Sequence, residues 1–118
     1  MAKVSGGNMS GRVGGGQAYT IDTTAQWTEP LEASDGLAGG FLVQIVGTGL
    51  TATLTFQLSG DGTNYVACLA TNLATGGTGT TATATGLFRI DSSGGLFRLY
   101  ATSVGAGSAV VTVCPYVG

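Results

Sequence analysis

The sequence predicts an all-β fold, a single β-sandwich of about eight short antiparallel strands. Short runs of alternating apolar and polar residues recur at intervals of about 8–12 residues, and glycine-rich turn signals separate them. No segment shows the 3.6-residue period and the caps of an amphipathic helix. We therefore expect a jelly-roll or immunoglobulin-like sandwich.

The composition favours the same fold class. The 118 residues include 22 Gly and 18 Thr, but only four Lys or Arg and six Asp or Glu. A chain of this length has room for one domain with one core. Thr is stiff at its branched Cβ and fits strands, whereas a helical bundle carries far more Glu, Lys, Leu and Arg.

The chain divides into two parts. Residues 1–16 contain six glycines and little that could be buried, so we expect a flexible N-terminal arm. Lys3 and Arg12 lie on this arm and make up half of the positive charge. Residues 17–118 are expected to form the sandwich domain.

Each expected strand follows from an apolar alternation bounded by turn residues. A loop over residues 23–40 carries acidic residues and is expected to lay Trp27 and Leu31 over one edge of the core. The glycines at 47–49 and 105–107 are expected to separate strands, and Asp61-Gly62 marks a hairpin turn. The predicted strands cover residues 17–22, 41–46, 52–59, 65–70, 80–85, 87–90, 96–101 and 109–115.

The same alternation predicts the core and the outer faces. The expected core residues are Tyr19, Ile21, Trp27, Phe41, Val43, Ile45, Leu54, Phe56, Leu58, Val66, Leu87, Ile90, Phe97, Leu99, Val111 and Val113. The opposite faces are also poor in charge, and they carry Leu42, Val46, Leu69, Leu96, Tyr100 and Val110. Such a surface suggests cover by copies of the chain or by another protein, the alternative being a surface coated with Thr and Ser hydroxyls.

Several kinds of chemistry lack the residues they need. The chain has no His, so no histidine base can activate a nucleophile. Cys68 and Cys114, without His, do not make a zinc site, and the glycine-rich segments lack the Lys and the helix of a phosphate-binding loop. We expect no catalytic residues, no cofactor, no metal site and no enzymatic activity.

The charge and hydropathy also limit the partners. A net charge of −2 leaves no basic surface for nucleic acid, and no apolar run has the length of a membrane span. The first residues lack the apolar segment of a signal peptide, so we expect synthesis in a cytoplasm. There, two small buried hydrophobic cysteines are favoured over a disulfide between Cys68 and Cys114.

Two binding interpretations stay open. Asp61, with Thr63 and Asn64, could offer oxygens to calcium, although a hairpin tip explains the same residues. Sugar rings stack on exposed aromatic side chains, for which the candidates are Trp27, Tyr65, Tyr100 and Tyr116.

A resemblance to known proteins begins at residues 56–66, Phe-Gln-Leu-Ser-Gly-Asp-Gly-Thr-Asn-Tyr-Val. It continues through Ala-Thr-Asn-Leu-Ala-Thr-Gly at residues 70–76, Gly-Leu-Phe-Arg-Ile-Asp at 86–91 and Leu-Phe-Arg-Leu-Tyr at 96–100. Over roughly residues 41–118 the chain resembles small β-sandwich virion proteins of tailed bacteriophages. Among these, it is most similar to capsid decoration (cement) proteins.

The resemblance implies a structural role in a virion, with synthesis in the host cytoplasm. The implied partner is the major capsid protein or another virion protein, and a homo-oligomer, a trimer or dimer, is implied as well. On this reading Lys3 and Arg12 meet acidic groups of the partner, and Trp27, Pro30 and Leu31 form an apolar anchor. Two alternatives are a receptor- or carbohydrate-binding module of a phage fibre and a bacterial β-domain outside any virus.

Overall fold

The protein is an all-β sandwich, as predicted. The computed structural model describes residues 2–4, 7–8, 17–32, 38–91 and 95–117, and every regular element among them is a strand. The strands are β1 (Ala2–Val4), β2 (Gly7–Asn8), β3 (Gln17–Ile21), β4 (Gln26–Thr28), β5 (Leu31–Glu32), β6 (Ala38–Ser59), β7 (Val66–Ala67), β8 (Ala70–Asn72), β9 (Thr78–Gly79), β10 (Thr81–Ala82), β11 (Gly86–Asp91) and β12 (Leu96–Val117).

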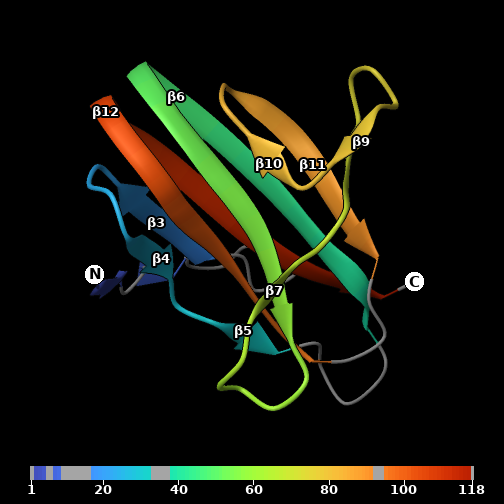
Figure 1. The fold of residues 1–118 in the computed structure, drawn as a ribbon. Coiled ribbons are helices and arrows are strands. Elements are labelled where there is room, and N and C mark those ends of the chain that lie inside the picture. Colours follow the sequence, from blue (N-terminus) through green and yellow to red (C-terminus); the bar gives the residue numbers. More distant parts are fainter. Residues whose placement is uncertain (1, 5–6, 9–16, 33–37, 92–94, 118) are drawn as a thin grey trace.

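Two long strands, β6 and β12, organise the fold. They have 22 residues each and pair antiparallel from Ser59–Leu96 at one end to Ala38–Val117 at the other. Figure 1 shows this two-stranded ribbon doubling back on itself, so that its two halves lie in opposite layers. The sandwich is therefore one sheet folded over, rather than two separate sheets.

The prediction of separate strands on either side of the central glycines was wrong. Neither Gly47–Gly49 nor Gly105–Gly107 ends a strand, because β6 and β12 continue through them. Gly49 and Gly107 have positive φ values of 57° and 76°, which glycine adopts without strain. The ladder shifts register between Val104 and Ser108, so the glycines and these irregularities bend the ribbon without breaking it.

Short strands complete each layer. The back layer joins β3, the second half of β12, the first half of β6, β11, β8 and β9. The front layer joins β4 and β5, the first half of β12, the second half of β6, β7 and β10. Within the predicted arm, β1 pairs parallel with β4 and β2 pairs antiparallel with β3.

The expected return strand at residues 65–70 is divided between the two layers. Its first part, β7, pairs with β6 at Val66–Leu58 and Ala67–Gln57. The chain then crosses to the back layer, where β8 pairs with β11. The hairpin prediction is thus correct only for the residues next to the turn.

The hairpin turn is held by the Asp61 side chain. Its Oδ1 accepts hydrogen bonds from the backbone N–H groups of Thr63 and Asn64, both at 2.8 Å. These bonds, with further ones from the side chains of Asn64 and Ser59, lower the pKa of Asp61 well below its usual range. The carboxylate is occupied by turn-forming donors, which supports the hairpin-tip interpretation over a calcium ligand.

The core lies between the layers and matches most of the predicted positions. Its buried side chains are Tyr19, Ile21, Phe41, Val43, Ile45, Ala52, Leu54, Phe56, Ala70, Ala82, Phe88, Ile90, Phe97, Leu99, Ala101, Ala109, Val111 and Val113. Leu87 was wrongly placed in the core: it is 38% exposed, and Phe88 points inward instead. Successive side chains of a strand point to opposite faces. Phe88 and Ile90 therefore share the buried face, and Leu87 points to the outer one.

Three other predicted core residues are less buried than expected. Val66 is 68% exposed, because β7 pairs with β6 over only two residues. Leu58 is half-buried against the core. Trp27 is half-buried and lies on the outer face of the front layer, since it pairs with Tyr100.

The two cysteines do not form a disulfide, as expected. Cys68 packs against the core, and this burial raises the pKa of its thiol to about 11. A thiol with such a pKa is protonated at neutral pH and therefore a poor nucleophile.

Candidate functional site: an arginine held by aromatic rings

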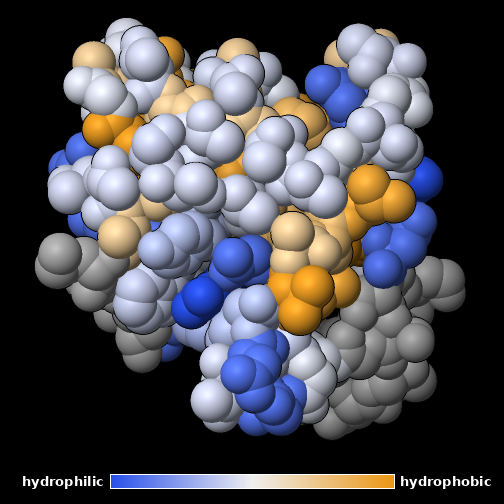
Figure 2. Space-filling model, in the orientation of Figure 1, coloured by the Kyte–Doolittle hydropathy of each residue, from blue (hydrophilic) through white to orange (hydrophobic). Residues whose placement is uncertain are grey.

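The outer face of the front layer carries a cluster of aromatic side chains around one arginine. Figure 2 shows that the upper part of this face is mostly pale, whereas strongly hydrophilic and strongly hydrophobic patches lie next to each other in its lower part. Thr53, Thr55 and Thr102 lie on or beside this part of β6 and β12, and the hydroxyl oxygens of Thr55 and Thr102 are 2.6 Å apart. The arginine cluster, as we call it, consists of Trp27, Gln57, Tyr65, Arg98 and Tyr100.

Strand pairing brings the members of the arginine cluster together. In the ladder, Tyr100 lies opposite Trp27 of β4, and Arg98 lies opposite Gln57 of β6. Tyr65 comes from the hairpin that leads into β7. Because alternate residues of a strand share one face, Arg98 and Tyr100 project from the same side of β12.

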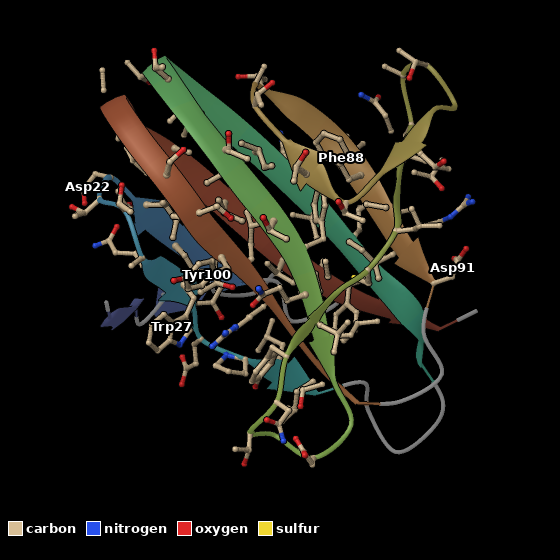
Figure 3. All side chains as sticks on the ribbon, in the orientation of Figure 1. Asp22, Trp27, Phe88, Asp91 and Tyr100 are labelled. Atoms are coloured by element: carbon tan, nitrogen blue, oxygen red, sulfur yellow. The ribbon has the colours of Figure 1, made fainter. Side chains whose placement is uncertain are left out.

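The rings and the guanidinium group are in contact. The Trp27 and Tyr100 rings stack with centroids 6.1 Å apart and an interplanar angle of 22°, and Figure 3 shows them side by side. The guanidinium carbon of Arg98 lies 3.9 Å from the Tyr65 ring centroid and 4.9 Å from that of Trp27. Both distances are within the range of cation–π attraction.

A hydrogen bond fixes the arginine in this position. The Nε of Arg98 donates to Oε1 of Gln57 at 2.7 Å. Burial beneath the rings lowers the pKa of Arg98, and the nearby Tyr65 and Tyr100 act in the opposite direction. The guanidinium group stays charged at neutral pH, because the pKa of arginine starts far above it.

The side chains of the arginine cluster are of the kinds that form binding surfaces. Trp, Tyr and Arg supply large contact surfaces and directed N–H and O–H donors. Among the described residues, no three His, Cys, Asp or Glu side chains are grouped so that they could hold a metal ion. In that same part of the chain, no helix is long and apolar enough to cross a membrane.

The structure separates the residues that the sequence proposed as an apolar anchor. Trp27 belongs to the arginine cluster, whereas Leu31 packs against the core on the inner side of the front layer, opposite Phe97. Pro30 lies between them and is half-buried. Their role in partner binding stays a prediction.

The charged residues of the arm are only partly placed. Lys3 lies opposite Trp27 in the parallel ladder of β1 and β4, and its side chain is outside the described part of the structure. Arg12 lies outside the described residues altogether.

Three of the four aromatic residues that the sequence offered for sugar binding meet in the arginine cluster. Trp27, Tyr65 and Tyr100 are all members, while the side chain of Tyr116 is outside the described part. Sequence reasoning missed Arg98 as the centre. The available signal was its position two residues before Tyr100, which puts both side chains on one face of a strand.

Comparison with known proteins gives one structural neighbour. The crystal structure of the SPBc2 prophage-derived protein YomS superposes with a TM-score of 0.63. The two sequences are 16% identical, and the match covers 85% of this chain and 92% of YomS. At this identity the likeness establishes a common fold. No protein-family model and no curated protein sequence matches the chain.

Proposed function

We propose that this chain is a non-enzymatic virion structural protein that binds and stabilises the capsid shell of a bacteriophage, as a decoration or cement protein. The arginine cluster carries the proposal, because it gathers Trp27, Tyr65, Tyr100 and Arg98 on an outer face. Trp, Tyr and Arg are the residues most enriched at the energetic centres of protein interfaces.

The surroundings of the arginine cluster fit the same role. Neighbouring positions on the front layer are Thr53, Thr55 and Thr102, which are uncharged and bring little side-chain entropy to lose on binding. The centres of protein interfaces are depleted in Lys, Glu and Asp. Residues around the centre contribute little binding energy themselves, but they exclude water from the central contacts. A threonine border around aromatic and arginine anchors has this composition.

Two observations support a phage partner. The chain resembles small virion proteins of tailed phages at residues 41–118, and its structural neighbour YomS is described as prophage-derived. The proposed partner is the major capsid protein or another virion protein. A homo-oligomer, a trimer or dimer, would multiply each contact through symmetry.

A second candidate function is a receptor- or carbohydrate-binding module of a phage tail or head fibre. The gathering of Trp27, Tyr65 and Tyr100 favours it, since sugars stack on such rings. In this structure, however, Arg98 lies over the rings, and its guanidinium carbon is 3.9 Å from the Tyr65 centroid. A sugar stacking on the same ring faces would have to displace it.

Copy number in the particle separates these functions. Gradient-purified virions from a host that carries the gene would be analysed by quantitative mass spectrometry. A copy number comparable with that of the major capsid protein is expected for a shell decoration protein. A number near that of tail or fibre proteins would favour the fibre module, and absence from particles would refute a virion role.

Attachment of variants tests the site itself. Particles that lack the protein would be mixed with purified variants and sedimented, and the bound fraction measured. Loss of one interface centre of about 2 kcal/mol or more weakens binding roughly thirtyfold, so we expect that effect for Trp27→Ala and Arg98→Ala. Arg89→Ala, on the opposite face, is the matched control and should bind normally. Loss with Arg89→Ala alone would move the interface to the back layer.

The arm has its own test. Deletion of residues 1–16 is expected to leave the sandwich folded and to weaken attachment, because Lys3 and Arg12 would no longer reach acidic groups of the partner. Circular dichroism would verify the fold. Full attachment by the truncated protein would remove the arm from the interface.

A further inference from the structure

A small pocket opens at the edge of the sandwich, away from the arginine cluster. It lies where the front layer, through Phe56 and Thr81, parts from the back layer, through Ala70 and Phe88. Its volume is about 210 Å³. The lining residues are Phe56, Ala70, Asn72, Thr75, Gly77, Thr78, Gly79, Thr81 and Phe88.

The lining combines polar, uncharged walls with two phenylalanine rings, of which Phe56 is fully buried and Phe88 is 8% exposed. The rings of Phe56 and Phe88 are 5.1 Å apart and tilted by 51°, and Figure 3 shows Phe88 between β11 and β10. The walls carry hydroxyl groups of threonine, an asparagine amide and glycine backbone. None of the lining residues is charged. The lining therefore favours a neutral ligand with many hydrogen-bonding groups.

The loop over the pocket is held in place by its own hydrogen bonds. The N–H of Asn72 donates to the carbonyl oxygen of Gly77 at 2.8 Å, and the N–H of Gly76 donates to the carbonyl oxygen of Asn72 at 2.7 Å. The N–H of Gly77 also donates to Oγ1 of Thr75 at 3.1 Å. A site ordered before the ligand arrives loses less entropy on binding.

Polar groups of the walls remain available to a ligand. Within the described part of the chain, no hydrogen bond of the protein uses the hydroxyl groups of Thr78 and Thr81. Each hydroxyl can donate one hydrogen bond and accept others.

We propose that this pocket binds one ring of a neutral carbohydrate. Sugar hydroxyls match the hydroxyl and amide groups of the walls. Phe88, which is 8% exposed, adds a small apolar contact for the C–H groups of the ring. The absence of charge among the lining residues disfavours acidic sugars, phosphates and amines. The site is independent of shell attachment, because it shares no residue with the arginine cluster.

The test is a nuclear magnetic resonance titration of the full chain, labelled with ¹⁵N. The probes are the methyl glycosides of glucose, galactose, mannose and N-acetylglucosamine. For at least one probe, shifts are expected at residues 70–81 and at Phe88. Thr81→Val removes one hydroxyl at nearly constant shape and should weaken binding about three- to tenfold, the worth of one hydrogen bond.

Two further variants make the result specific. Thr83→Val is the matched control, since Thr83 is exposed and is not part of the lining, and its affinity should equal that of the wild type. Gly79→Leu adds a side chain to the lining, where a Cβ would meet no atom within 4 Å, and should abolish binding without unfolding the chain.

Three results would overturn the proposal. These are the absence of shifts with every probe at its solubility limit, equal affinity of Thr81→Val and wild type, and shifts centred on Trp27 and Tyr65 instead. The last result would place the sugar at the arginine cluster. Virion copy number is unaffected by any of them, so this proposal and the proposed function can fail separately.

Discussion

The same four residues, Gly-Leu-Phe-Arg, begin β11 at residues 86–89 and lead into β12 at residues 95–98. In both segments the phenylalanine points into the core and the arginine points outward. The two arginines nevertheless differ in their surroundings. Arg89 is well exposed and forms an ion pair with Asp91 at 3.3 Å, whereas Arg98 is covered by aromatic rings.

The neighbouring strands explain this difference. The front layer supplies Trp27 from β4 and Gln57 from β6 to the two sides of Arg98. Arg89 lies between Leu42 of β6 and Thr71 of β8, neither of which has an aromatic ring. A local sequence therefore sets which way a side chain points, and the strand pairing sets what it meets.

The two phenylalanines should show the largest effects on stability. Phe97 is fully buried and stacks on Phe41 with centroids 5.2 Å apart. Phe88 lines the pocket and retains 8% exposure. We expect Phe97→Ala to lower the free energy of unfolding by about 4 kcal/mol and Phe88→Ala by about 2–3 kcal/mol, because water can enter beside the second site. Urea denaturation measures both free energies of unfolding. Equal losses of stability in the two variants would contradict this prediction.

The next largest effects on stability are expected at Gly86 and Gly95, the glycines that begin the two segments. Gly95 has a φ of 87°, and a Cβ there would lie 2.7 Å from the carbonyl oxygen of Ser59. At Gly86 a Cβ would lie 2.9 Å from the Phe88 ring, which can shift. Gly95→Ala should therefore cost about 2–3 kcal/mol, and Gly86→Ala about 1 kcal/mol. Thermal unfolding of both variants checks the order, and a greater loss with Gly86→Ala would contradict it.

Substitution of the two arginines should affect stability less than substitution of the glycines. Arg98→Ala removes the contacts with Trp27 and Tyr65 and should cost about 1–2 kcal/mol. Arg89→Ala removes an exposed ion pair and should change stability by no more than about 0.5 kcal/mol. A double-mutant cycle of Arg98 with Trp27 would measure their coupling. Zero coupling would show that the rings only cover the arginine and do not stabilise it.

The two leucines should show the smallest effect. Leu87 is 38% exposed, so Leu87→Thr should change stability by less than about 0.5 kcal/mol. Leu96 is half-buried beside the hairpin turn at Gly62, and Leu96→Thr should cost about 1 kcal/mol. Chemical denaturation of the two variants side by side tests this, and the reverse order would mean that the back face is covered in solution.

Sequence reasoning predicted the all-β fold and most of the core, because alternation alone decides which residues of a strand share a face. It placed Phe41, Phe56 and Phe97 correctly. It wrongly ended strands near Gly49 and Gly107. Glycine can adopt a positive φ both in a turn and in a bend within a continuous strand, so the sequence alone does not distinguish the two.

The arginine cluster could be predicted only in part. The sequence offered its aromatic members as candidates for sugar binding, although it also placed Trp27 in the expected core. Their meeting depends on which strands pair, and on β12 lying between β4 and β6. Contacts such as that of Trp27 with Tyr100 join residues far apart in the sequence, so no local pattern indicates them.

The doubled ribbon of β6 and β12 has a consequence for how the chain folds. Ser59 pairs with Leu96, so the pocket-forming segments between them must be closed into a loop before the ribbon can form. Proteins with such distant pairings gain their contacts late and fold in milliseconds to seconds. Because both layers share the same two strands, we expect them to form together. We expect refolding to follow a single slow exponential, with hydrogen exchange of both layers limited by the same global opening.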